Sequence, residues 1–205
     1  VDPVLTKSHT PEPATVGESV IYTLEVVIPP DLVMYDAVVV DDMPTGLSFE
    51  GLDGVTCAPV ACSPVTVLDA TAPQAAPTVG YWLGDLGPFA AEQTISIDYV
   101  ATITDVPTNT DGDTFVNSAQ LRWNGTNSVV GTPGTTPPTS TYDVDPVLDT
   151  LEMVEPELLI DKDVALSGCN TTADPVNAGT DDDTCNIEPD GTAFTYTLTV
   201  RNVGS

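Results

Sequence analysis

The sequence predicts an antiparallel β-sandwich, and three observations lead to this fold class. Short runs rich in Val, Ile, Thr and aromatic residues recur along the chain, and several of them alternate apolar with polar residues. Clusters of Pro and Gly separate these runs at positions typical of turns. The apolar period of a helix is absent over any useful length. Many short strands joined by frequent turns favour two packed sheets, Ig-like in the broad sense.

The predicted strands cover most of the first 123 residues. In chain order they span residues 4–7, 20–28, 35–42, 65–70, 79–86, 93–103 and 115–123. Turn signals interrupt them at IPPD (28–31), MPTG (43–46), GLDG (51–54), LGPFA (86–90), NTDGD (109–113) and GTPGTTPP (131–138). Each of these segments is rich in the residues that initiate or complete tight turns.

An internal repeat organises the chain. Its only lysines, Lys7 and Lys162, each end a short apolar run of strand character. Each is followed by a similar strand, GESVIYTLEV from Gly17 and GTAFTYTLTV from Gly191. Self-similarity of this kind indicates stacked modules. We therefore expect tandem Ig-like repeats, a complete one in residues 1–150 and the start of a second in residues 151–205.

The second repeat contains only two predicted strands before Ser205. Two strands cannot bury a sandwich core by themselves. The simpler expectation is that the natural chain continues beyond this segment. The alternative is that the two strands complete a neighbouring subunit by strand addition, as expected in a polymer.

The composition is strongly acidic. The chain has 31 acidic residues against 4 basic ones, a formal net charge of −27, although charged residues make up only 17% of it. Such a field repels nucleic acid and anionic membranes, and it suits solubility in salty surroundings or the binding of cations. No apolar run is long enough to span a membrane. We therefore expect neither nucleic acid nor membrane insertion in this segment.

Four cysteines form two local pairs within loop-like sequence, Cys57 with Cys62 and Cys169 with Cys185. Local pairs in loops favour disulfides and an oxidising compartment. A zinc site is the weaker alternative, because neither pair has the tight spacing of structural zinc ligands and no histidine lies nearby. We expect the two disulfides to hold loops rather than the core.

A series of short motifs occurs in a characteristic order: Thr6-Lys7-Ser8, Val16-Gly17-Glu18 leading into Tyr22-Thr23-Leu24, Val40-Asp41-Asp42-Met43-Pro44-Thr45-Gly46-Leu47-Ser48-Phe49, Gly84-Asp85-Leu86-Gly87, and Val116-Asn117-Ser118-Ala119. In this order they resemble the DUF11 repeat, found in tandem in large prokaryotic surface proteins and similar to isopeptide-forming fimbrial domains. The resemblance implies an Ig-like sandwich with an extracellular, architectural role and no enzyme activity. The implied partners are neighbouring repeats or copies of the same chain in a stalk or fibre.

An intramolecular isopeptide bond is the chemistry that these motifs could carry. It requires a lysine on an early strand, an asparagine on a late strand and a carboxyl group between them in an apolar pocket. Desolvation lowers the lysine pKa, which frees a neutral amine, and raises the pKa of the carboxyl, which can then polarise the amide carbonyl. Lys7 and Asn117 are the bonding candidates. Asp41 is the first candidate for the carboxyl group, and Asp98 is the alternative.

The strand pattern separates the two carboxyl candidates only in part. Asp41 follows three valines in the Met-Pro motif. Ile95, Ile97, Tyr99 and Ala101 share one face of their strand, which leaves Asp98 on the other face with Ser96 and Val100. The plain alternative is that Lys7 is a solvated surface cation. Against it, no other lysine occurs before Lys162.

Two further kinds of site are predicted on loops. Asn109, Asp111 and Asp113 place oxygen ligands at alternate positions around a glycine turn, as in part of a calcium loop, but without the distal bidentate glutamate. A solvated turn is the plain alternative. Asn124 and Asn170 begin glycosylation sequons.

The expected function is a stalk or filament segment of a secreted or surface protein. The alternative is an adhesive module that exposes Tyr81-Trp82 or Trp123 to a carbohydrate or protein ligand. The motifs of common hydrolases and phosphate-binding enzymes are absent from the sequence, and the single histidine, His9, has no partner motif of a nucleophilic enzyme and is expected at the surface. The sequence therefore predicts no enzyme.

Overall fold

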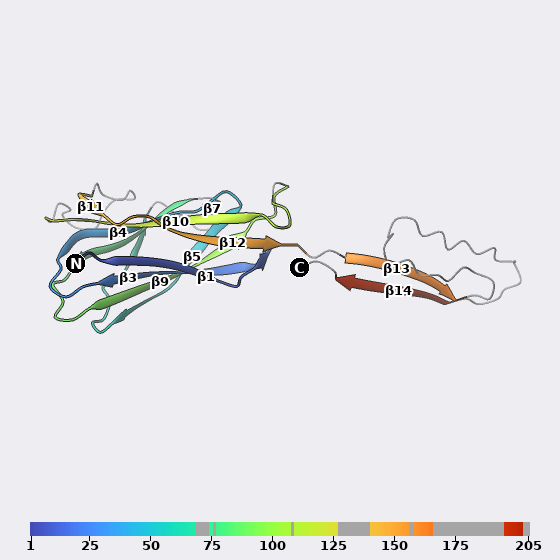
Figure 1. The fold of residues 1–205 in the computed structure, drawn as a ribbon, viewed down its shortest axis with the longest axis horizontal. Coiled ribbons are helices and arrows are strands. Elements are labelled where there is room, and N and C mark those ends of the chain that lie inside the picture. The colour runs from blue at the N-terminus through green and yellow to red at the C-terminus, as the bar shows by residue number, and fades with distance from the viewer. Residues whose placement is uncertain are drawn as a thin grey trace, which may run out of the picture. The chain divides into compact units, whose positions relative to one another are not determined.

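The chain divides into two compact units, and its described elements are strands. The computed structural model describes residues 1–68, 74–75, 77–107, 109–126, 140–155, 158–165 and 195–202. The two units are Val1–Val154 and Glu155–Ser205. Every described element is a β-strand, as Figure 1 shows. The all-β prediction is therefore confirmed.

The first sheet of unit 1 has five strands in the order β1-β3-β9-β5-β7. Their bounds are β1 Val4–Thr10, β3 Ser19–Ile28, β9 Gln93–Ile103, β5 Leu47–Ala58 and β7 Gln74–Ala75. All neighbouring pairs are antiparallel. Along β3 and β9 every second residue is buried, because successive side chains of a strand point to opposite faces.

The second sheet of unit 1 has the order β2-β12-β10-β4-β8-β6, with β11 paired to β10. Its strands are β2 Ala14–Thr15, β12 Val147–Val154, β10 Thr114–Asn124, β4 Met34–Asp42, β8 Thr78–Leu86, β6 Thr66–Leu68 and β11 Tyr142–Asp143. The short pair of β2 with β12 is parallel, and the other pairs are antiparallel. The sheet is therefore almost purely antiparallel, as predicted.

The inner faces of the two sheets enclose one apolar core. The first sheet contributes the fully buried Tyr22 and Tyr99, and the second contributes Tyr81. These rings pack on one another, with centroids 5.3 Å apart for Tyr22 and Tyr99 and 5.6 Å apart for Tyr81 and Tyr99. Aromatic contacts across the interior join the two sheets and confirm the sandwich.

The predicted turn at GLDG (51–54) is wrong, because β5 runs through it. The ladder between β5 and β9 continues on both sides, with register shifts between Phe49 and Gly51 and between Leu52 and Gly54. Gly51 has a φ of 145°, which an L side chain rarely adopts. The glycines thus form irregularities within a long strand instead of ending it.

Strand β12 was not predicted, and it sets the end of unit 1. Residues 114–119 of β10 pair with residues 147–152 of β12, so the segment after residue 140 returns to the first sandwich. The boundary between the two compact units consequently lies after Val154 and not after residue 150.

Unit 2 repeats the register of the first two long strands. β13 (Leu158–Ala165) pairs with β14 (Thr195–Asn202) so that Lys162 lies opposite Leu198. In unit 1, Lys7 lies opposite Leu24 in the same way. This agreement supports the repeat hypothesis.

Cys57 and Cys62 form the predicted disulfide, with Cα atoms 5.3 Å apart. Cys57 is in β5 and Cys62 in the loop that follows it. Cys169 and Cys185 lie outside the described residues.

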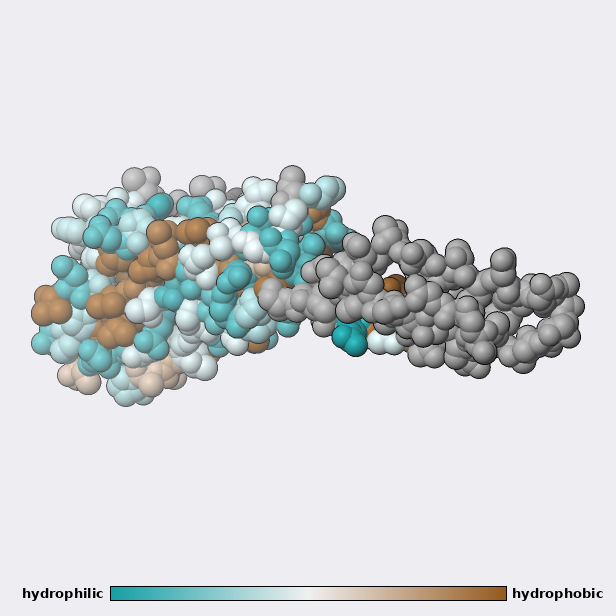
Figure 2. Space-filling view, turned by 45° about the vertical axis from the view of Figure 1, so that its right-hand side comes forward, coloured by the Kyte–Doolittle hydropathy of each residue, from teal (hydrophilic) through white to brown (hydrophobic). Residues whose placement is uncertain are grey.

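The surface of unit 1 mixes hydrophilic and apolar residues, as the face in Figure 2 shows. Large exposed apolar side chains are dispersed over several strands, among them Val4, Ile21, Leu52, Val116 and Leu148. No helix long and apolar enough to cross a membrane occurs among the described residues.

Gly46 offers a test of the packing. An added Cβ at Gly46 would lie 2.4 Å from Phe115 Cε1, whereas at Gly17 it would meet nothing within 4 Å. Both glycines have positive φ, at 102° and 79°. We expect Gly17→Ala to lower the free energy of unfolding by about 1 kcal/mol, and Gly46→Ala by about 1 to 3 kcal/mol more. Urea unfolding followed by tryptophan fluorescence measures both. Equal losses would contradict the described contact with Phe115.

Candidate functional site

Lys7 points into the core of unit 1. It lies on β1, two residues after the buried Leu5, so the alternation of the strand turns both side chains inward. Its side chain has a relative exposure of 0%. Lysine is almost never fully buried without a partner. The alternative of a solvated surface cation is therefore at odds with this structure.

Asp41 is the partner of Lys7. It lies on β4 in the opposite sheet, on the same inward face as Val39, and its side chain is also completely buried. The Lys7 ammonium or amine group donates to Asp41 Oδ2. Tyr99 on β9 donates its hydroxyl to the same oxygen, with an Oη to Oδ2 distance of 3.1 Å. One carboxyl oxygen of the second sheet thus accepts from two groups of the first sheet.

Asn117 completes the cluster from β10. In the ladder with β4, Ala119 lies opposite Asp41, so Asn117 is two positions away on the same face of the neighbouring strand. Asn117 is 0% exposed. Its Nδ2 donates to Tyr99 Oη over 2.8 Å. Lys7, Asp41, Tyr99 and Asn117 therefore form one continuous chain of hydrogen bonds across the core, which we call the lysine cluster.

Burial sets the protonation of this cluster. Desolvation lowers the pKa of Lys7 even though the nearby Asp41 carboxylate acts in the opposite direction. Desolvation likewise raises the pKa of Asp41 even though Lys7 opposes it. Both shifts favour the pair as a neutral amine and a neutral carboxylic acid. Burial also raises the pKa of Tyr99 well above its usual value, so this hydroxyl keeps its proton.

Two acceptors in the lysine cluster lack a donor among the described residues. They are Asp41 Oδ1 and Asn117 Oδ1, and both are buried. Buried polar atoms without partners are rare and costly in folded proteins. A proton on Asp41 Oδ1 would make this atom a donor instead of an acceptor without a donor, which is a second reason for a neutral carboxylic acid at this position.

The alternative carboxyl, Asp98, lies outside the lysine cluster. It is on the opposite face of β9 from Tyr99, as the strand pattern predicted, and accepts a hydrogen bond of 2.7 Å from Thr23 Oγ1. The structure thus brings Asp41, and not Asp98, to Lys7.

Tyr99 is the member of the cluster that the sequence analysis missed. The alternation of β9 placed it on the apolar face with Ile95 and Ile97, but gave no sign that its hydroxyl joins two polar groups. A tyrosine in place of an aliphatic residue on a buried face was the one available signal, because a buried phenol usually has a hydrogen-bond partner.

His9 is less exposed than expected. Its side chain is 6% exposed and lies between Glu12 and Asp149, with Nδ1 2.6 Å from Asp149 Oδ2 and Nε2 in contact with Glu12. Glu12 also accepts a hydrogen bond of 3.2 Å from the backbone N–H of Glu152. These contacts connect the end of β1 with β12.

Two of the predicted calcium ligands form hydrogen bonds within the segment that joins β9 to β10. Asn109 donates through Nδ2 to the carbonyl of Thr104 over 2.8 Å, and Asp113 accepts from the backbone N–H and hydroxyl of Thr110. Among the described residues, no group of three or more His, Cys, Asp or Glu side chains could hold a metal ion. The calcium hypothesis, including Asp111, therefore rests on the sequence alone.

The sequon residue Asn124 is 5% exposed. Its Nδ2 donates to Asp36 over 3.1 Å and its Oδ1 accepts from Thr141. A glycan on Nδ2 would have to displace the bond to Asp36. Asn170 lies outside the described residues.

The aromatic residues considered for an adhesive surface are largely buried. Tyr81 is 0% and Trp123 7% exposed, and Trp82 packs partly buried against Val38 and Val40 on the outer face of the second sheet. Among these three aromatic residues, only Trp82 keeps substantial exposure.

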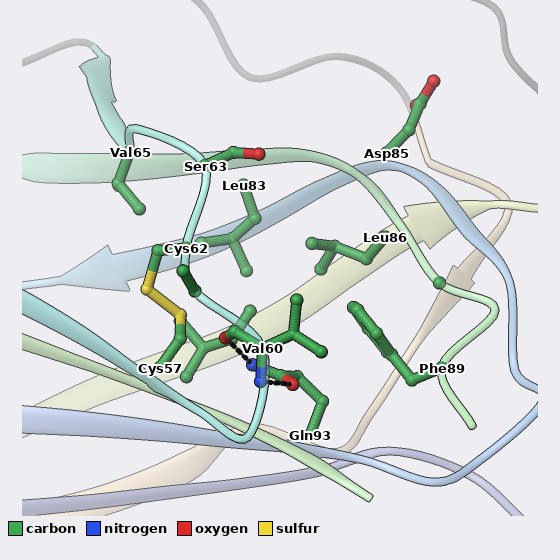
Figure 3. A pocket seen from close by; sticks show the side chains of 13 residues that line it. Cys57, Val60, Cys62, Ser63, Val65, Leu83, Asp85, Leu86, Phe89 and Gln93 are labelled. Carbon is green, nitrogen blue, oxygen red and sulfur yellow. Dashed lines mark hydrogen bonds between the residues drawn. A yellow bond between two sulfur atoms is a disulfide. The ribbon is translucent and has the colours of Figure 1, made fainter. Parts of the chain in front are cut away.

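A pocket of about 230 Å³ lies beside the disulfide (Figure 3). Its lining includes Cys57, Cys62, Val65, Leu83, Leu86 and Phe89. Gln93 closes one side by donating to the carbonyl of Val60 over 2.7 Å and accepting from its N–H over 3.0 Å. These bonds hold the disulfide loop against the sheet.

Comparison with known proteins gives a fold but no family. No family profile matches the sequence, so the resemblance to the DUF11 repeat remains a hypothesis, and no curated protein matches the sequence.

Several solved structures share the fold. The pilus backbone protein RrgB of Streptococcus pneumoniae has a TM-score of 0.51 and 21% identity over 62% of this chain and 33% of its own. A 35 kDa C-terminal fragment of the major pilin GBS80 of Streptococcus agalactiae has a TM-score of 0.50 and 13% identity, covering 82% of this chain and 65% of its own. The major pilin BcpA of Bacillus cereus has a TM-score of 0.50 and 15% identity, covering 82% and 51%. The chain spans less than two thirds of each of these structures, and at these identities the similarity concerns the fold.

His9 should make the stability of unit 1 depend on pH. Burial alone would lower its pKa, but hydrogen bonds to Glu12 and Asp149 outweigh burial and raise it above 6.5. The stabilisation is therefore complete below the unfolded-state pKa and is lost as the pH rises through the folded-state value. We expect the difference in unfolding free energy between the wild type and His9→Gln to shrink from about pH 6 to about pH 8. Urea titrations at both values measure it, and a pH-independent difference would be evidence against this linkage.

Proposed function

We propose that this chain is a structural segment of an extracellular stalk or filament, and that an isopeptide bond between Lys7 and Asn117 locks its first unit. The single observation that carries the proposal is the completely buried Lys7, paired with Asp41 and connected through Tyr99 to Asn117. A buried ion pair alone is weak evidence for a structural role, because it contributes little to stability. A role as a reactive amine would explain why this lysine is buried in an apolar core.

The proposed reaction follows from the protonation of the cluster. The neutral amine of Lys7 attacks Cγ of Asn117 and forms the Nζ–Cγ bond. Asp41, as a carboxylic acid, stabilises the negative charge that develops on Asn117 Oδ1. The Cγ–Nδ2 bond then breaks and ammonia leaves. The product is an amide between β1 and β10, and it contains no charge that the core has to solvate.

The position of this bond suits a chain under tension. Lys7 is on β1, the first strand of unit 1 and a strand of the five-stranded sheet, and Asn117 is on β10 in the other sheet. β12, which continues into unit 2, is paired directly with β10. A pull on both ends of unit 1 would therefore pass from β1 through the covalent bond to β10 and its neighbour. Strands β3 to β9 would stay outside this path.

The solved structures with this fold support the assignment. They are a pilus backbone protein and two major pilins. The Cys57–Cys62 disulfide fits an oxidising environment outside the cytoplasm. The proposed partners are accordingly neighbouring repeats or further copies of the chain, and unit 2 is proposed to be the beginning of a second repeat of the same kind.

Intact mass under denaturing conditions tests the bond. We expect the purified chain, with its disulfides reduced, to be lighter than its sequence by one ammonia. Lys7→Ala and Asn117→Ala should each remove the deficit, because each deletes one reacting group. Asp41→Ala should remove it by deleting the acid.

Lys162→Ala is the matched control, since it deletes the other lysine of the chain and should keep the deficit. A wild-type mass equal to the sequence mass would overturn the proposed bond.

A further inference from the structure

Formation of the proposed bond requires a proton to cross the lysine cluster. The attacking Nζ of Lys7 starts as –NH2 and ends as an amide N–H, so it loses one proton. The leaving Nδ2 of Asn117 starts as –NH2 and departs as ammonia, so it gains one proton. The oxygen and carbon atoms of the reacting groups carry the same protons before and after the reaction. The net requirement is thus one proton transferred from Nζ to Nδ2.

The core holds a hydrogen-bonded route between these two nitrogens. Lys7 Nζ contacts Asp41 Oδ2, the same Oδ2 lies 3.1 Å from Tyr99 Oη, and Oη lies 2.8 Å from Asn117 Nδ2. All of these groups are buried. Asp41 alone does not contact Nδ2 in this arrangement, because the phenol stands between them.

We propose that Tyr99 is a catalytic residue that delivers the proton to the leaving ammonia. The inference rests on the proposed Lys7–Asn117 bond and adds a step to it. As Nζ forms its bond to Cγ, Asp41 gives its acid proton to the developing oxyanion on Asn117 Oδ1 and takes at Oδ2 the proton that Nζ loses. As the Cγ–Nδ2 bond breaks, the electron pair of that bond goes to Nδ2, Tyr99 gives its hydroxyl proton to it, and Tyr99 takes the proton held by Asp41. As the carbonyl re-forms, Asn117 Oδ1 returns its proton to Asp41, so the phenol and the carboxyl group both finish in their starting protonation.

The hydroxyl is suited to relay a proton without ionising. In the ground state Nδ2 is a planar amide nitrogen that can only donate, so Tyr99 Oη accepts from it and donates to Asp41. In the tetrahedral intermediate Nδ2 becomes an amine with a lone pair. The hydroxyl can then rotate about its C–O bond and donate to Nδ2, and its acceptor side turns to the acid of Asp41. Because Tyr99 donates one proton while it accepts another, no buried phenolate forms.

The ring of Tyr99 is fixed by its neighbours. Tyr22 stacks on it at 5.3 Å with an interplanar angle of 11°, and Phe49 contacts it at 6.0 Å. Tyr81 packs on it from the other sheet at 5.6 Å. Tyr81 is also fully buried, but its hydroxyl has no hydrogen-bond partner among the described residues. Tyr81→Phe is therefore a matched control that removes a buried hydroxyl beside the same ring.

The experiment follows bond formation over time. The full chain and the variants Tyr99→Phe and Tyr81→Phe are made by cell-free synthesis, quenched in denaturant at intervals and weighed by mass spectrometry. Tryptophan fluorescence and protease resistance of parallel samples report when each chain has folded. We expect the deficit of one ammonia to appear about 100-fold or more slowly in folded Tyr99→Phe than in the wild type. Tyr81→Phe should match the wild type.

The outcomes separate the two proposals. A deficit that forms equally fast in folded Tyr99→Phe and in the wild type overturns the relay and leaves the bond in place. A deficit that is absent from the wild type overturns both. Equal slowing in Tyr99→Phe and Tyr81→Phe would also contradict the relay, because the loss of either buried hydroxyl would then slow the reaction through altered packing.

A second measurement does not depend on the folding of a variant. Proton transfer through Asp41 and Tyr99 during the bond-breaking step predicts slower loss of ammonia from the wild-type chain in D2O than in H2O. The folding rate in each solvent is followed by tryptophan fluorescence, so that a solvent effect on folding is not counted. Equal rates of ammonia loss after folding would contradict the relay.

Discussion

The structure of unit 1 depends on accommodating one lysine in an apolar core. A buried ammonium without compensation is prohibitively costly, and even a paired one recovers little stability. The surrounding residues therefore have to supply an acid and exclude water. Asp41, Tyr99 and Asn117 meet these needs from three further strands, and together with Lys7 they connect both sheets. The same arrangement lowers the pKa of the amine and raises that of the acid, which prepares both groups for amide chemistry.

The architecture explains how such groups can meet. Lys7 and Asn117 are distant in the sequence, yet each lies on an inward position of a long strand, and the two sheets bring these positions together across the core. The stacked tyrosines around them exclude water. A rigid sandwich thus orients reactive groups without a flexible loop or a bound cofactor in the proposed mechanism. In a stalk, the resulting bond would hold the first strand to the sheet through which tension leaves the unit.

Much of the fold could be predicted from period-two alternation and turn residues. β3 and β9 were recognised because their inward and outward residues differ sharply in polarity. β5 was not, because its glycines resemble turn signals, and only pairing with β9 shows that they are irregularities within a strand. β12 was missed for a similar reason, since its burial depends on β10 rather than on a distinctive local pattern.

The lysine cluster was predictable in part. The rarity of lysine in the sequence and the order of the motifs indicated Lys7, Asn117 and Asp41, and the strand alternation of β9 explains why Asp98 faces away. Tyr99 could not be assigned a role, because its polar atom acts only through contacts between strands far apart in the sequence. The contact of His9 with Asp149 could not be predicted for the same reason, since Asp149 reaches it from β12.

The most direct test of the central claim is a crystal structure of the chain at atomic resolution. The account predicts continuous electron density between Lys7 Nζ and Asn117 Cγ at the length of an amide bond, with Asp41 and Tyr99 still in contact with the linked atoms. A separate Lys7 amine and an intact Asn117 carboxamide, seen in fully matured protein, would contradict it.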